Sequence, residues 1–164
     1  MRGFFCYNVR MKRGRRVPIK HWSHSSLMAF LRNPLAWYKR YVEKVYDTPS
    51  SPSSFVGRAG HVALEHFYRG MEKEGAKGQG LVYLHNVQDA EINFGRASSI
   101  RAKKKRRKQM EREYNQAVSF YLARPPRYKV LGVEVNALAH VEGLPLPVKA
   151  VSDLVVRSKV ESGA

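Results

Sequence analysis

The chain has 164 residues, 43% of them hydrophobic and 11% aromatic, which excludes a disordered protein and allows a single domain with a real core. No apolar run is long enough to cross a bilayer, and the N-terminus lacks the apolar segment and the cleavage site of a signal peptide. We therefore expect an intracellular, cytoplasmic protein without a membrane partner. The one cysteine, Cys6, excludes an internal disulfide and any multi-cysteine metal or iron–sulfur site within this chain.

The formal net charge of +17 is concentrated in two segments. Residues 1–20 are rich in arginine and lysine and contain no acid, and Gly14 and Pro18 limit regular structure there, which predicts a flexible basic arm. The second segment has seven cations in eight residues, and these are Arg101, Lys103, Lys104, Lys105, Arg106, Arg107 and Lys108. Such a field attracts polyanions, so nucleic acid is the expected partner. An anionic membrane surface, an RNA-rich assembly and solvated charges without a specific partner are the alternatives.

Residues 21–47 predict two helices that meet at Asn33-Pro34, because proline ends one helix and suits the first turn of the next. Ser25 or Ser26 is the expected cap of the first helix. Its apolar positions are Leu27, Phe30 and Leu31. The apolar face of the second helix is expected to contain Leu35, Tyr38, Val42 and Val45, with Trp37 and Tyr41 beside it. The aromatic residues fit a core better than a base-stacking surface, although an exposed ring beside a basic groove could stack on a single strand.

Residues 48–123 predict a loop, helices and a break in turn. The loop is TPSSPSS, residues 48–54, and the helix after it has Gly57 and Gly60 near its start and Gly75 beyond its end. A glycine there would let the helix approach another backbone closely. The apolar positions of this helix are Val62, Leu64 and Phe67. Residues 76–80 predict a break between helices, and residues 81–97 predict a further helix, although their signals are mixed. Residues 98–123 predict a long helix that ends before Pro125-Pro126. The second half of the long helix is amphipathic through Tyr114, Val118, Tyr121 and Leu122.

Residues 128–157 predict two strands joined by a turn at Gly143-Leu144-Pro145, with Pro147 at the start of the return strand. Alternate apolar residues predict one buried face of the first strand, and these are Val133, Val135, Ala137, Ala139 and Val141. Glu134 lies on the first strand and Asp153 in the middle of the second. Aspartate is poorly suited to a strand interior, and a half-buried carboxylate needs a partner, a donor or a metal. A solvent-facing or salt-bridged acid is the simpler alternative.

Four segments, taken together, resemble the motifs of the RecB-like branch of the PD-(D/E)XK nuclease superfamily. They are SHSSLMAFLRNPLAWYKRYV (residues 23–42), FVGRAGHVALEHF (55–67), VLGVEV (130–135) and GLPLPVKAVSDLVV (143–156). The resemblance implies an α+β, restriction-endonuclease-like fold, in which N-terminal helices precede a β-hairpin that opens a central mixed sheet. It also implies that residues 21–164 form the nuclease domain. Asn33 stands where cluster-binding relatives have a cysteine before Pro34, so no iron–sulfur cluster is expected.

The same resemblance implies a metal site made by Asp153 as the principal ligand, His61 as an auxiliary ligand and Glu134, which could also bind through water or only orient the site. Hydrolysis of a phosphodiester needs a cation that polarises the phosphate and makes hydroxide available near neutral pH. Mg²⁺ prefers carboxylate oxygens, and Mn²⁺ tolerates a histidine nitrogen better, so Mg²⁺ or Mn²⁺ is expected. Arg58 and the seven cations of residues 101–108 are the expected nucleic-acid contacts.

The expected function is metal-dependent cleavage of single- or double-stranded DNA, as an exonuclease or a recombination or repair nuclease. Recombination or replication proteins are further candidate partners. The family's (D/E)-x-K element belongs on the strand after Asp153, whereas Lys159-Val160-Glu161 has these residue types in reverse order. We therefore expect the chain to be the N-terminal portion of such a domain, truncated at its C-terminus, with incomplete catalysis. The alternative is a non-catalytic basic protein that binds nucleic acid through its cationic segments alone.

Overall fold

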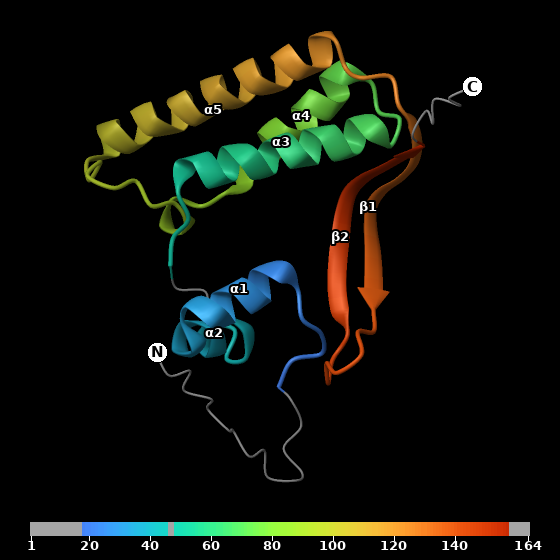
Figure 1. Ribbon diagram of the computed structural model, residues 1–164. Helices are drawn as coiled ribbons and strands as arrows, with labels where there is room; N and C mark the ends of the chain where they lie inside the picture. The colour runs from blue at the N-terminus through green and yellow to red at the C-terminus, as the bar shows by residue number, and fades with distance from the viewer. Residues whose placement is uncertain (1–17, 46–47, 158–164) are drawn as a thin grey trace, which may run out of the picture. The chain divides into compact units, whose positions relative to one another are not determined.

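The computed structural model describes residues 18–45 and 48–157, and it has the expected α+β order of helices followed by a hairpin (Figure 1). The expected basic arm, apart from residues 18–20, and Lys159-Val160-Glu161 lie outside the described residues. The elements are α1 (His24–Arg32), α2 (Pro34–Tyr41), α3 (Pro52–Tyr68), α4 (Lys73–Asn86), the short 3₁₀ helix η1 (Asp89–Glu91), α5 (Ile100–Ala123), β1 (Lys129–Ala139) and β2 (Val148–Arg157). Of the described residues, 18–45 and 138–149 form one compact unit, and 48–137 and 150–157 form the other.

In the first unit, Asn33 separates α1 from α2 as predicted. Its backbone N–H donates to the carbonyl of Ala29 at 2.9 Å and so closes α1, while its side-chain oxygen accepts from the N–H of Ala36 at 3.1 Å and caps α2. The predicted cap of α1 is wrong by two or three residues. Ser23 has the extended backbone that a cap requires and accepts from the N–H of Ser26 at 3.2 Å.

An aromatic cluster around Trp37 forms the interior of this unit, and it corrects the predicted face of α2. Trp37 is buried and its indole N–H donates to the hydroxyl of the buried Ser26 at 2.9 Å, whereas Leu35 and Tyr38 are exposed. The neighbouring rings lie with their centroids 5.2–6.1 Å apart in the pairs Trp22–Phe30, Trp22–Trp37, Phe30–Trp37 and Trp37–Tyr41. Large rings bury more apolar area than leucine or valine, so they decide which face of a short helix turns inward. The helix ends at Tyr41, before the predicted Val45.

In the second unit, α3, α4 and α5 pack against one another around one core (Figure 1). The long helix α5 is confirmed: Ser99 caps it, and the buried side chains follow every fourth residue, at Met110, Tyr114, Val118 and Leu122. The buried residues of α3 are Pro52, Phe55, Ala59 and Ala63. Of the apolar residues noted in the sequence, Leu64 and Phe67 are partly buried and pack against this core. Small alanines at this spacing let neighbouring helices approach α3 closely.

The predicted loop at 48–54 and the predicted break at 76–80 are both corrected. Ser51 caps α3 and Pro52 occupies its first turn, so only residues 48–51 remain a loop. The glycine-rich stretch 76–80 lies inside α4. Glycine at position 80 allows a close helix contact, since a Cβ there would lie 2.6 Å from the carbonyl oxygen of Ala59 and would also overlap the hydroxyl of Tyr114. The close approach that we expected at Gly57 and Gly60 thus occurs on the next helix, since a Cβ at either of those two would meet nothing within 4 Å.

Residues 81–97 are not one helix. The helix α4 ends at Asn86, and η1 and a bridge between Ile92 and Ser50 follow. Val87 and Ile92 are buried in the core, so these apolar residues pack against it although they are not part of a helix. The hydroxyl of Tyr114 donates to the carbonyl of Lys77 at 2.7 Å, and burial raises the pKa of Tyr114 to about 12. Val87 and Ile92 therefore complete the core that α3, α4 and α5 share.

The hairpin is confirmed, and its predicted buried face is wrong. The N–H of Leu144 donates to the carbonyl of Val141 at 3.1 Å and Gly143 has φ +81°, which is a turn that favours glycine. Of the alternating apolar residues only Val133 is partly buried, and the others are exposed. In the described part of the chain the sheet has two antiparallel strands, and Trp22 forms an isolated parallel bridge with Val148 at the start of β2. None of the described helices has the length and hydropathy that crossing a membrane would require.

Candidate functional site

Three predicted site residues from three elements converge within the second unit. His61 is on α3, Glu134 on β1 and Asp153 on β2. One ligand atom from each lies within 4.8 Å of the other two, and His61 Nδ1 is 3.7 Å from Asp153 Oδ2. The structure therefore brings together the imidazole and both carboxylates, although the helix and the hairpin are far apart in the sequence.

These side chains face solvent and are not part of a core. The side chains of His61 and Asp153 are 64% and 67% exposed, and Glu134 is half-buried. An ion pair this exposed contributes little to stability, because water screens it and two side chains must be held in place. The arrangement is thus better suited to binding something from solvent than to holding α3 against the hairpin.

Glu134 has a backbone conformation that a strand residue rarely adopts. Its φ is +52°, in the left-handed region, which costs a residue with a Cβ about 1–2 kcal/mol. Gly132 is two residues earlier, and a Cβ there would lie 2.5 Å from Cγ2 of Val135, so a side chain at position 132 would have to displace that of Val135. Backbone strain is concentrated at functional sites, and the strained residue here is the one that lies beside His61 and Asp153. The strand pattern gave no sign of this kink; the only signal was the glycine in VLGVEV.

Glu134→Gly should separate the stability of the protein from its affinity for metal. Removal of the left-handed strain should leave the free energy of unfolding unchanged or raise it by up to about 1 kcal/mol. Loss of the carboxylate should weaken Mn²⁺ binding by about 10-fold or more. Thermal unfolding and a Mn²⁺ titration measure the two effects. Asn136→Gly, on the same strand without positive φ, is the control and should destabilise by roughly 0.5–1 kcal/mol. An equal destabilisation by both changes would contradict the strain at Glu134.

The donor set fits a hard or borderline divalent cation. Ligand atoms about 2.1 Å from one ion lie up to roughly 4 Å apart, so small side-chain rotations from the observed separation suffice. Two carboxylate oxygens suit Mg²⁺, and the imidazole nitrogen makes Mn²⁺ equally suitable. Among the described residues, this is the group of histidine and acidic side chains that could hold such an ion.

The cations of residues 101–108 have different environments on α5. The guanidinium of Arg107 donates to Asp89 at 2.7 Å and to the carbonyls of Val87 and Leu84 at 2.5 and 3.3 Å, so it closes the C-terminal end of α4. Arg106 lies 3.7 Å from Glu113, and Lys103 lies over the ring of Phe94. The remaining cations are exposed, and they form no hydrogen bond or ion pair within the described ranges: Arg101, Lys104, Lys105 and Lys108.

Arg107→Ala should destabilise the fold, whereas Lys104→Ala should not. The first change removes three hydrogen bonds from a charged donor to α4 and η1 and should cost about 2 kcal/mol. The second removes an exposed side chain and should change stability by less than about 0.5 kcal/mol. Urea unfolding of both variants measures the difference. Equal stabilities would show that Arg107 is a surface cation like its neighbours.

Arg58 lies three residues before His61 on α3. It is exposed, and its guanidinium lies over the ring of Phe55, 5.2 Å from the centroid. Residues three apart lie on the same side of a helix, so Arg58 and His61 share a side of α3. The guanidinium itself is directed toward Phe55, which precedes Arg58 by three residues.

Comparison with known proteins gives one match. A family model described as the PD-(D/E)XK nuclease superfamily matches residues 21–163, which include α1 to β2 and all three convergent ligands. Searches of curated proteins and of solved structures returned no match. The match covers most of the chain, and the helices-then-hairpin order agrees with it. The chain therefore belongs to the PD-(D/E)XK nuclease superfamily.

Proposed function

We propose that the protein is a RecB-like, metal-dependent DNA nuclease that binds Mg²⁺ or Mn²⁺ through Asp153, Glu134 and His61. The observation that carries the proposal is the convergence of one ligand atom from each of these residues within 4.8 Å. Membership of a nuclease superfamily implies a nucleic-acid substrate, and such nucleases generally use divalent metals. We also assign DNA as the substrate and an exonuclease, recombination or repair role to the protein.

The three side chains have distinct tasks in this proposal. When bound, a divalent cation polarises the scissile phosphate and lowers the pKa of a bound water. The carboxylates of Asp153 and Glu134 hold positive charge at the site, and the kink at Glu134 fixes the direction of its side chain. His61, on a rigid helix, supplies the third donor through a ring nitrogen. The high exposure of His61 and Asp153 leaves room for a phosphate and a water.

Positive charge near the ligands and along α5 would hold the DNA backbone. We assign a phosphate contact to Arg58, an exposed cation on the same side of α3 as His61, whose guanidinium would turn from Phe55 toward the phosphate. The exposed cations of α5 would add contacts that carry no sequence preference, and each phosphate neutralised makes binding more sensitive to salt. Arg107 is left out of this set because its donors are used within the fold.

Cleavage of labelled DNA with Mg²⁺, with Mn²⁺, and with a chelator tests this function. Cleavage should require one of the metals, should stop on chelation and should return when metal is added in excess. Linear and covalently closed circular DNA should be compared, because an exonuclease degrades only the linear form. Cleavage that persists in chelator would contradict the metal site. DNA binding without cleavage would also follow from the incomplete catalysis expected when Lys159-Val160-Glu161 does not provide the (D/E)-x-K element, so Mn²⁺ binding decides that case. Absence of both cleavage and Mn²⁺ binding would favour the non-catalytic alternative.

A further inference from the structure

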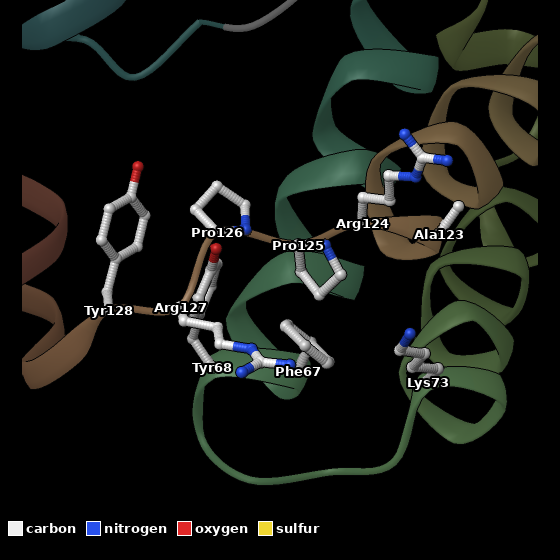
Figure 2. Close-up of a pocket in the computed structure, with 9 residues that line it drawn as sticks. All are labelled: Phe67, Tyr68, Lys73, Ala123, Arg124, Pro125, Pro126, Arg127 and Tyr128. Carbon is white, nitrogen blue, oxygen red and sulfur yellow. The ribbon is translucent and has the colours of Figure 1, made fainter.

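A second site is suggested by a pocket of about 710 Å³ in the same unit (Figure 2). The end of α3, the first residue of α4 and the segment 123–128, which leads from α5 into β1, line it. Its volume is in the range of small-ligand sites. Pro125 and Pro126 fix the backbone of the connecting segment, so the side chains on either side of them are held on a stiff support.

The lining is positively charged. Lys73, Arg124 and Arg127 line the pocket, and no acidic side chain does. None of the ion pairs in the described part of the chain involves these three cations. The C-terminal ends of α3 and α5 contribute roughly half a negative charge each, and the N-terminal end of α4 roughly half a positive charge. The two full charges of Arg127 and Lys73 outweigh the net partial charge of the helix ends, so the pocket attracts an anion.

The lining is also aromatic. The ring of Tyr68 lies 5.1 Å from that of Phe67 and 6.4 Å from that of Tyr128. The hydroxyls of Tyr68 and Tyr121 are 2.6 Å apart, and burial, with this hydrogen bond second, raises the pKa of Tyr68 above its ordinary value, so the ring is anchored and neutral. Tyr128 is 49% exposed, so its side chain is partly open to solvent. In Figure 2 the side chain of Arg127 extends toward Phe67 and Lys73, whereas Arg124 points away from them.

Two elements connect this pocket with the three metal ligands. Tyr68 follows His61 by seven residues on α3, which is two turns, so the two residues share a face about 10 Å apart. Tyr128 immediately precedes β1 and lies six residues before Glu134, a span of about 20 Å along a strand. A flexible polyanion held in the pocket could therefore reach the ligands along α3 and the hairpin.

We propose that the pocket binds one nucleotide of single-stranded DNA, with its phosphate on Arg127 and Lys73 and its base stacked on Tyr128. The chemistry of the lining matches both parts of a nucleotide, since cations bind the phosphate and every base has a flat face that stacks on an aromatic ring. A base in a duplex has both faces covered by its neighbours, so the pocket selects an unpaired strand. The path of that strand to the metal ligands rests on the proposed nuclease function.

The test is the affinity of the full chain for a labelled 12-nucleotide single strand and for a blunt duplex of the same length, measured by fluorescence anisotropy in chelator so that no cleavage occurs. Tyr128→Ala should weaken single-strand binding by about 10-fold and change duplex binding by less than about twofold. Tyr128→Phe should retain the affinity, because the ring remains. Arg127→Gln should weaken single-strand binding by about fivefold and reduce its salt dependence by about one contact.

Two matched substitutions serve as controls. Tyr38→Ala removes an exposed tyrosine of α2 and should leave both affinities unchanged, and Arg101→Gln removes an exposed arginine of α5 and should lower both by a similar factor. The proposal is overturned if Tyr128→Ala and Arg127→Gln leave single-strand affinity within about twofold, or if they weaken both DNA forms alike. Because this assay contains no metal, it tests the pocket separately from cleavage. Metal-dependent cleavage without the Tyr128 effect would contradict nucleotide binding in the pocket and leave the nuclease function standing. The Tyr128 effect without metal-dependent cleavage would contradict the nuclease function and leave nucleotide binding standing.

Discussion

Asp153→Asn should weaken Mn²⁺ binding by at least about 100-fold and remove metal-dependent cleavage of DNA. The substitution keeps the size of the side chain and removes the negative charge that a divalent cation requires. Changes to groups that only orient metal ligands already cost about 10- to 100-fold in affinity, so the loss of a ligand should cost at least the upper end of that range. A Mn²⁺ titration and a cleavage assay with excess metal measure the two effects.

DNA affinity in chelator should remain within about threefold of the parent, because the cations of α5 are untouched by Asp153→Asn. Glu142→Gln provides a matched control, since Glu142 is an exposed acid in the hairpin turn that is not one of the convergent ligands. It should change neither metal binding nor cleavage. If Asp153→Asn and Glu142→Gln behaved alike, Asp153 would be an ordinary strand acid, and the non-catalytic binding protein would be the better description.

Gly80→Ala should destabilise the second unit by about 3 kcal/mol, which is on the order of 10 °C in the melting temperature. An added Cβ would lie 2.6 Å from the carbonyl oxygen of Ala59 and would overlap the hydroxyl of Tyr114. The backbone of α3 cannot move aside without opening the buried stripe of Phe55, Ala59 and Ala63. Overpacking therefore outweighs the gain of about 1 kcal/mol that alanine gives in a helix.

Gly78→Ala is the matched control for Gly80→Ala. Gly78 lies on the same helix, and a Cβ there would meet nothing within 4 Å. This substitution should raise the free energy of unfolding by up to about 1 kcal/mol, so the two changes should have opposite signs. Calorimetry or urea unfolding measures both. Two stabilising substitutions would show that α3, α4 and α5 do not meet as closely as the structure has them.

For the site, the sequence supplied the residue types and the structure supplied their geometry. The motif order around His61, Glu134 and Asp153 was enough to select these residues. The left-handed backbone of Glu134 was not predictable, because alternation of apolar residues describes a regular strand and contains no signal for a positive φ at one residue. Arg107 was assigned to nucleic acid together with its neighbours, since no local pattern shows that the carbonyls at the end of α4 lie within its reach.

Local sequence patterns were sufficient to predict the order of helices and hairpin, the division at Asn33-Pro34, the buried stripe of α5 and the turn at Gly143. These features depend on interactions within a few residues: caps, proline geometry, helical spacing and positive φ. Tertiary packing was needed to show that Trp37 is the buried residue of α2, that Gly80 lies inside a helix and that the hairpin leaves most of its predicted face exposed. Each of these depends on what a distant segment places against the residue, and a pattern along one segment contains no information about that partner.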